Sequence, residues 1–215
     1  MREQKMFAKV FMWMFIGLFV TAGSSYYVAS NPNMLMNIFG TNTYFWLVLL
    51  EFGLVIFLSA RIGKMKPMTA GITFLLYSLV SGVTLASIFV AFDLNSIMLA
   101  FGLTSMLFLI FGLIGYLTNI DLTKMGNILL MMLFGIIIVS IINIFLGNTI
   151  LDIIICIIGV VAFLGLVAYD VQKIRVLTLE MEDENKAAIY GALQLYLDFV
   201  NIFLYILQLF GKHND

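Results

Sequence analysis

Seven runs of about 20 apolar residues occupy most of the chain, and each is long enough to cross roughly 30 Å of hydrocarbon as an α-helix. In chain order the runs cover residues 7–29, 43–61, 68–91, 96–118, 126–147, 150–172 and 187–210. Hydrophobic residues make up 63% of the 215 residues and charged residues only 11%, which excludes a water-soluble protein of this size. Because backbone polar groups within a bilayer must be satisfied internally, the runs predict an all-α integral membrane protein.

The first run has one property of a secretory signal, because basic residues precede it. It is longer than the apolar core of a signal peptide, however, and no convincing small-x-small cleavage site follows it. We therefore expect a retained first membrane helix. With that helix included, residues 1–215 are predicted to form a single domain of seven transmembrane helices.

The basic residues sort to one side of the predicted helices. If the N-terminus is cytoplasmic, Lys212 alone among the 11 lysines and arginines falls on the outer side. The others, all on the cytoplasmic side, are Arg2, Lys5, Lys9, Arg61, Lys64, Lys66, Lys124, Lys173, Arg175 and Lys186. Because translocation of lysine and arginine is disfavoured, this pattern predicts a cytoplasmic N-terminus and a C-terminus outside the cell.

One face of the seventh run is polar along its whole length. Spacings of three and four residues place on this face Tyr190, Gln194, Asp198, Asn201, Tyr205 and Gln208. One interpretation is a set of hydrogen bonds between helices, which is common in membrane bundles. The other is a hydrated ion path lined by Gln194, Asp198 and Asn201, because an ionised carboxylate in lipid needs partners or water.

A second aspartate is predicted to lie level with Asp198. Residues equidistant from the turn of an antiparallel hairpin lie at the same height, and the midpoint of Asp170 and Asp198 falls in the acidic turn "EMEDEN". Two carboxylates within hydrogen-bonding distance cannot both ionise cheaply, so such a pair would share a proton and sense pH. With nearby carbonyl or amide oxygens, Asp170 and Asp198 would also suit a transiently bound Ca²⁺. Alternatively, Asp170 pairs with Lys173 or Arg175 at the membrane surface.

Three further charged residues lie in or next to the runs. Arg61 ends the second run at a height from which it can reach Asp170, although it also fits an ordinary cytoplasmic anchor. Glu51 lies about ten residues deeper, where a carboxylate points to an ion path. Asp152 begins the sixth run, and we expect it to cap that helix and complement its dipole, or else to serve as a vestibule charge.

The reactive side chains argue against an enzyme. His213 is the single histidine and lies in the C-terminal tail, and Cys156 is the single cysteine, in the middle of an apolar run where it suits packing. No lysine lies deep in a run, as a retinal Schiff base would need. No metal-hydrolase spacing or phosphate-binding glycine loop occurs. We therefore expect no enzymatic activity and no cofactor, and the net charge of −1 gives no reason to expect nucleic acid.

Three short motifs carry a resemblance to a known family. They are "SARIGK" at 59–64, "AYDVQKI" at 168–174 and "GALQLYLDFVNIF" at 191–203. With these motifs and the seven-run layout, the chain resembles the Bax-inhibitor/TMBIM family over nearly its whole length, above all its bacterial YetJ-like members. The resemblance implies a central C-terminal helix wrapped by two three-helix layers. It also implies a pH-dependent calcium leak in a bacterial plasma membrane.

The same resemblance assigns roles to individual residues. It implies that Asp170 and Asp198 match the di-aspartyl pH sensor of the family and that Arg61 matches the arginine that latches onto it. Gln208 departs from the pattern, since some relatives carry a basic residue there.

Three functional hypotheses follow, and only the first is a passive channel. In the first, Ca²⁺ leaks down its gradient through a gate formed by the aspartate pair and the Arg61 latch. In the second, the same carboxylates exchange Ca²⁺ for H⁺. In the third, the chain is a non-transporting regulator of membrane-protein quality control or cell survival. The expected partners are the lipid bilayer, Ca²⁺ as transported ion and H⁺; no protein partner is predicted.

Overall fold

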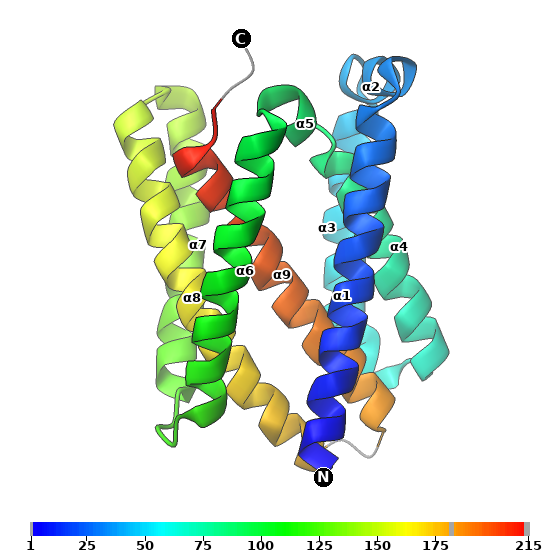
Figure 1. The fold of residues 1–215 in the computed structure, drawn as a ribbon, viewed down its shortest axis with the longest axis vertical. Helices are drawn as coiled ribbons and strands as arrows, with labels where there is room; N and C mark the ends of the chain where they lie inside the picture. Colours follow the sequence, from blue (N-terminus) through cyan, green and yellow to red (C-terminus); the bar gives the residue numbers. More distant parts are fainter. Residues whose placement is uncertain (1, 181–182, 213–215) are drawn as a thin grey trace. The chain divides into compact units, whose positions relative to one another are not determined.

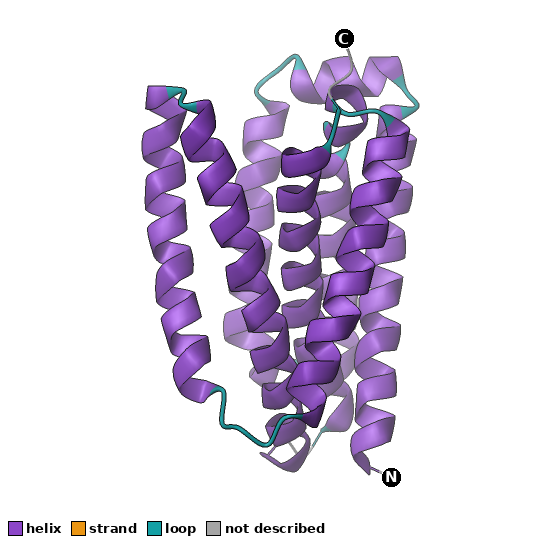
Figure 2. Ribbon diagram, turned by 60° about the vertical axis from the view of Figure 1, so that its left-hand side comes forward, coloured by secondary structure: helices purple, strands orange, loops and turns teal. Residues whose placement is uncertain are grey.

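The computed structural model describes residues 2–180 and 183–212, and every regular element in these residues is helical (Figures 1 and 2). The long helices are α1 (Arg2–Ala29), α3 (Thr43–Arg61), α4 (Pro67–Leu85), α6 (Leu94–Leu117), α7 (Thr123–Leu146), α8 (Thr149–Glu180) and α9 (Glu184–Phe210). Shorter elements are α2 (Pro32–Phe39), α5 (Ile88–Ala91) and a 3-10 turn at Ile62–Lys64.

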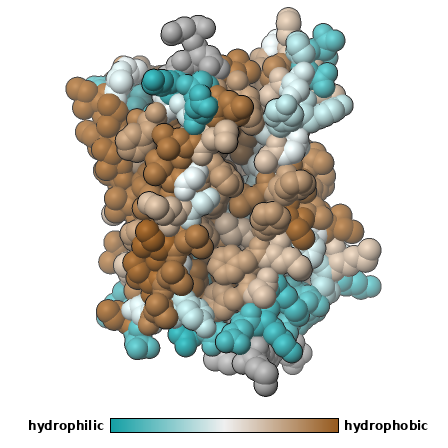
Figure 3. Space-filling model, viewed as in Figure 1, coloured by the Kyte–Doolittle hydropathy of each residue, from teal (hydrophilic) through white to brown (hydrophobic). Residues whose placement is uncertain are grey.

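Seven of the described helical segments are long and apolar enough to cross a membrane. Hydrophobic side chains cover the lengths of the helices, and hydrophilic ones gather at the helix ends (Figure 3). Lipid tails are as apolar as the side chains that face them, so this surface fits a bilayer rather than water. The predicted fold class, an all-α membrane protein with seven spans, is confirmed.

Two details of the predicted layout differ from the structure. The connection after the first run contains α2, which begins at Pro32, a residue well suited to the first turn of a helix. The sixth run was expected to end at 172, but α8 continues to Glu180. Hydropathy marks only the part of a helix that lies in hydrocarbon, whereas the hydrogen bonds of a helix are local and continue into polar sequence. Part of the predicted acidic turn (181–182) and His213 lie outside the described residues.

The helices group into two compact units. Unit 1 comprises the described residues of 1–93 and 176–196, and unit 2 comprises residues 94–175 and 197–212. Helices α8 and α9 therefore each contribute to both units. The single domain over 1–215 and the two three-helix layers around a central helix stay predictions.

In unit 1, α1 packs closely against α4, and α3 also packs against α4. Glycines permit the close approach: Gly17 lies against the Phe74 ring, and Gly82 lies against Thr21 and its neighbour Ser24. Small residues at such contacts let helix backbones approach, which is a main source of packing energy in membranes.

In unit 2, glycines allow α8 to pack closely against three helices, α6, α7 and α9. Gly115 of α6 lies directly against the backbone of Ala168, Gly165 of α8 lies against Leu129 of α7, and Gly159 of α8 lies against the Tyr205 ring of α9. Helix α9 also contacts α6, because Phe199 packs edge-on against Phe101 and Phe108. This packing holds α8 against α6, α7 and α9 within unit 2.

Candidate functional site

Asp170 of α8 and Asp198 of α9 form the buried acidic pair of unit 2. Their exposed fractions are 6% and 4%, and their carboxyl groups are side-chain hydrogen-bond partners. An ionised carboxylate has no hydrogen to donate, so this hydrogen bond requires a proton on one of the two groups. The Oδ2 atom of Asp198 is buried without a hydrogen-bond partner among the described residues. The equal spacing from the turn predicted that the two aspartates lie at the same height, and the structure adds that their carboxyl groups are neighbours.

Lys173 is the cation that acts on both carboxyl groups. It follows Asp170 by three residues on α8, and its ammonium lies 5.8 Å from the centre of the Tyr169 ring. Lys173 therefore acts on the carboxyl pair as a whole, and its ion pair with Asp170 stays a prediction. The influence of Lys173 on Asp198 was not predicted, although its spacing from Asp170 was a usable signal because residues three apart share a helix face.

The other basic residue considered for Asp170 is directed elsewhere. The Arg175 guanidinium donates to the Tyr116 carbonyl oxygen over 3.4 Å and lies 5.7 Å from the centre of that residue's ring. Both contacts join α8 to α6. Arg175 therefore anchors α8 near its polar end.

Gln172, which the sequence did not single out, ties the connection between α6 and α7 to α8. Its amide nitrogen donates to the Ile120 carbonyl oxygen over 2.8 Å, and its amide oxygen accepts from the Leu122 N–H over 2.9 Å. This pair of hydrogen bonds holds the connection between α6 and α7 against Gln172, which follows Asp170 by two residues. Only tertiary contact identifies it, because a glutamine at a helix end has many possible partners.

The remaining members of the predicted polar face are less buried than Asp198. Gln194 and Asn201 are half-buried, in units 1 and 2 respectively, and the Asn201 amide donates to the Leu197 carbonyl oxygen of its own helix over 2.7 Å. Their place on an ion path stays a prediction.

Cys156 and Gln208 meet in unit 2. The Cys156 thiol is buried and donates to the Gln208 side-chain oxygen over 3.1 Å. The contact joins the first part of α8 to the last part of α9.

Glu51 and Arg61 both lie on α3 in unit 1. The Glu51 carboxylate is half-buried and accepts a hydrogen bond from the Thr84 hydroxyl over 2.7 Å. The Arg61 side chain is exposed at the end of the helix. The predicted Arg61 latch on Asp170 and the ion-path role of Glu51 stay predictions.

The prediction that Asp152 caps the sixth membrane helix was wrong. Helix α8 begins at Thr149, and the Asn148 side-chain oxygen accepts from the N–H groups of Ile150 (3.0 Å) and Leu151 (3.1 Å). A cap precedes the first helical residue, so Asn148 and not Asp152 fills this role. Asp152 lies in the first turn, where the helix dipole still favours an acidic residue.

Asn143 connects α7, the turn and α8, and we expect Asn143→Ala to lower the free energy of unfolding by about 2 kcal/mol. Its side chain is buried, donates to Asp152 and to the Asn148 carbonyl oxygen, and accepts from the Asn148 N–H. Alanine would leave these groups without their partner. Thermal unfolding of the detergent-solubilised protein measures the change.

The matched control is Asn127→Ala, which removes an exposed amide from the same helix. We expect no change in its melting temperature. Equal melting temperatures for both variants would show that the Asn143 hydrogen bonds contribute nothing to stability.

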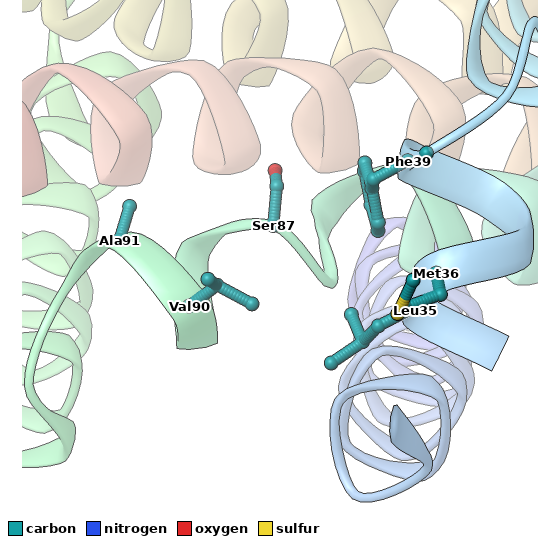
Figure 4. A pocket seen from close by; sticks show the side chains of 7 residues that line it. Leu35, Met36, Phe39, Ser87, Val90 and Ala91 are labelled. Carbon is teal, nitrogen blue, oxygen red and sulfur yellow. The ribbon is translucent and has the colours of Figure 1, made fainter. Parts of the chain in front are cut away.

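A pocket between α2 and α5 in unit 1 is apolar (Figure 4). Its volume is about 440 Å³, and its lining residues are Leu35, Met36, Phe39, Gly40, Ser87, Val90 and Ala91. Ser87 is the one polar side chain among them, and none of them titrates. The pocket therefore offers no charge for an ion.

The described residues contain no cluster of side chains that could hold a permanently bound metal ion. Over 2–180 and 183–212, no three histidine, cysteine, aspartate or glutamate side chains gather closely enough to hold a metal. Ca²⁺ prefers six to eight oxygen ligands. A transient Ca²⁺ contact at Asp170 and Asp198 would thus need backbone or water oxygens as well, and it stays a prediction.

Comparison with known proteins gives similarity over nearly the whole chain. The sequence model of the family described as "Inhibitor of apoptosis-promoting Bax1" matches residues 3–215. A protein of Borreliella burgdorferi is 42% identical over 99% of this chain and 94% of its own. The inner membrane protein YbhL of Escherichia coli K12 is 40% identical over 97% of this chain and 92% of its own. A protein of Deinococcus radiodurans is 34% identical, with 97% and 90% covered.

Proposed function

The chain belongs to the Bax inhibitor family of membrane proteins, and on that premise we propose that it is a pH-sensitive calcium leak channel gated by Asp170 and Asp198. Its motif-based resemblance to this family is confirmed by the family match and by its bacterial relatives. The observation that carries the proposal is the buried, hydrogen-bonded carboxyl pair between two membrane-spanning helices.

In the proposed gate, the shared proton keeps the closed state together. At low pH the proton joins Asp170 to Asp198 and holds α8 against α9. Loss of the proton places two negative charges in contact within a poorly solvated site, which costs free energy. The population then shifts toward a state in which the carboxyls separate, and Ca²⁺ moves down its gradient. In this proposal Arg61 stabilises the closed state by pairing with Asp170.

The rest of the proposal concerns the path and the orientation. Polar side chains at Glu51, Gln194, Asp198 and Asn201 would replace part of the hydration shell of the ion. The distribution of basic residues supports a cytoplasmic N-terminus and an outer C-terminus in a bacterial plasma membrane. The E. coli relative carries the name inner membrane protein.

The experiment that tests the function is Ca²⁺ entry into dye-loaded proteoliposomes between about pH 6 and about pH 8, where a shared carboxyl proton would be lost. We expect entry to rise about tenfold across this range, since one proton leaves per opening. Empty liposomes measure the background. Absence of entry at every pH, with a folded protein, would refute the channel and favour the regulator hypothesis.

A proton gradient in the same vesicles separates a leak from an exchanger. We expect Ca²⁺ entry to stop when the two sides reach electrochemical equilibrium. Uphill Ca²⁺ accumulation driven by protons would instead establish Ca²⁺/H⁺ exchange at the same carboxyls.

A further inference from the structure

Tyr196 of α9 is the centre of a buried hydroxyl cluster in unit 1. Its side chain is 0% exposed. Its ring packs edge-on against Phe74 and Tyr77 of α4, with ring centres 5.7 Å and 5.8 Å away. These aromatic contacts place its hydroxyl between α1 and α4.

The Tyr196 hydroxyl binds α1 directly, because its oxygen lies 2.6 Å from that of Thr21. The single hydroxyl hydrogen of Thr21 is directed at the carbonyl oxygens of Gly17 (3.0 Å) and Ser78 (2.9 Å). The Tyr196 and Thr21 hydroxyls thus share one hydrogen bond, in which either oxygen can donate. The Ser81 hydroxyl of α4 is a further hydrogen-bond partner of Tyr196.

The cluster extends to α3 through a carboxylate. Ser81 is also a side-chain hydrogen-bond partner of Tyr77, and the charge of Glu51 acts on Tyr77 and Tyr196. Glu51 in turn accepts from Thr84, whose hydroxyl also contacts the Ser81 carbonyl oxygen over 2.9 Å. Polar side chains of α1, α3 and α4 thus converge on one residue of α9.

Tyr196 precedes Asp198 by two residues on the same helix. Residues two apart point to different sides of a helix, so the cluster acts on Asp198 through the backbone of α9 and not by contact. The hydroxyl cluster and the hydrogen bond between Asp170 and Asp198 are both formed in this structure. The structure thus contains the hydroxyl cluster in the state in which the carboxyls are paired.

We propose that Tyr196 is a positioning residue for the carboxyl pair: its hydroxyl contacts hold α9 in unit 1 and thereby set the pH at which Asp170 and Asp198 separate. The inference rests on the proposed function, because it names a regulator of the same gate. In this proposal Tyr196, a residue of unit 1, influences the titration of two carboxyls that belong to unit 2.

The test compares Tyr196→Phe, Thr21→Val and the double variant. Both single changes keep the size of the side chain and remove one hydroxyl of the shared hydrogen bond. One net hydrogen bond changes an equilibrium about fivefold, so each single variant should lower the pH midpoint of Ca²⁺ entry by roughly 0.7 unit. The effect of the double variant should fall short of the sum of the two single effects, because both changes remove the same bond.

Tyr27→Phe is the control for removal of a tyrosine hydroxyl. Tyr27 lies on α1 in the same unit, and its side chain is 60% exposed. We expect the wild-type midpoint for this variant. A purely structural role of Tyr196 would lower thermal stability and total entry without moving the midpoint.

A second readout does not depend on Ca²⁺ entry. Cys156 is the single cysteine and contacts Gln208 of α9, so its labelling rate with N-ethylmaleimide reports the position of α9. Comparison of each variant with wild type at the same pH separates a shifted midpoint from the pH dependence of the thiolate fraction, which is common to them. We expect the wild-type rate to rise with pH, and the midpoint to fall by roughly 0.7 unit in Tyr196→Phe and Thr21→Val.

The two readouts separate failure of the inference from failure of the channel. Shifted labelling midpoints without any Ca²⁺ entry would support the positioning role and refute the channel. A labelling midpoint of Tyr196→Phe equal to wild type, additive effects in the double variant, or labelling that is independent of pH in the wild type would overturn the inference.

Discussion

Asp198→Asn should remove the pH dependence of Ca²⁺ entry and hold entry at pH 8 about tenfold below wild type, since one titrating proton changes an equilibrium by at most about tenfold per pH unit. The asparagine amide donates a permanent hydrogen bond to Asp170, in place of one that deprotonation breaks. Only one negative charge can then form in the pair, so its ionisation no longer separates α8 from α9. The measurement is dye-reported entry into proteoliposomes across the same pH range.

Asp170→Asn should give the same flat profile, and the double variant should not add to it, because the two carboxyls share one proton. Asp121→Asn is the matched control. Hydrogen bonds from Thr123 lower the pKa of this exposed carboxyl, so Asp121 stays ionised between pH 6 and pH 8 and is no sensor. A wild-type flux profile in Asp198→Asn would exclude the aspartate pair as the gate.

Gly115→Ala should lower the free energy of unfolding by about 2 to 3 kcal/mol, the usual cost of forcing extra atoms into a packed contact. A Cβ on Gly115 would meet the backbone of Ala168, which cannot turn aside as a side chain can. Helix α6 must then move away from α8 close to Asp170. For a protein of this size the melting temperature should fall by about 5 to 10 °C.

Gly102→Ala on the same helix is the control, since nothing lies within 4 Å of the atom it adds. Alanine is the better helix former, so this change should be neutral or stabilise by up to about 1 kcal/mol. If both variants melted at the same temperature, close packing of α6 on α8 would not contribute to stability.

Much of the fold is visible in the sequence because its main signals are local. The length and apolarity of each run depend on neighbouring residues alone, so the seven spans and the helical class could be predicted. Where apolarity ends before the helix does, as in α8 beyond residue 172, the same signal placed the boundary wrongly. The equal height of Asp170 and Asp198 followed from hairpin geometry, which also depends only on distance along the chain.

The sequence by itself determined the number of spans, the family and the equal height of two aspartates. Only the tertiary structure decided which residues surround them: Lys173 acts on both carboxyls, Asn148 rather than Asp152 caps α8, and Tyr196 binds Thr21. A polar side chain has many possible partners in a sequence, and its choice depends on how helices distant in the chain are rotated and packed. That rotation is set by close contacts such as Gly115 against Ala168, which no local pattern encodes.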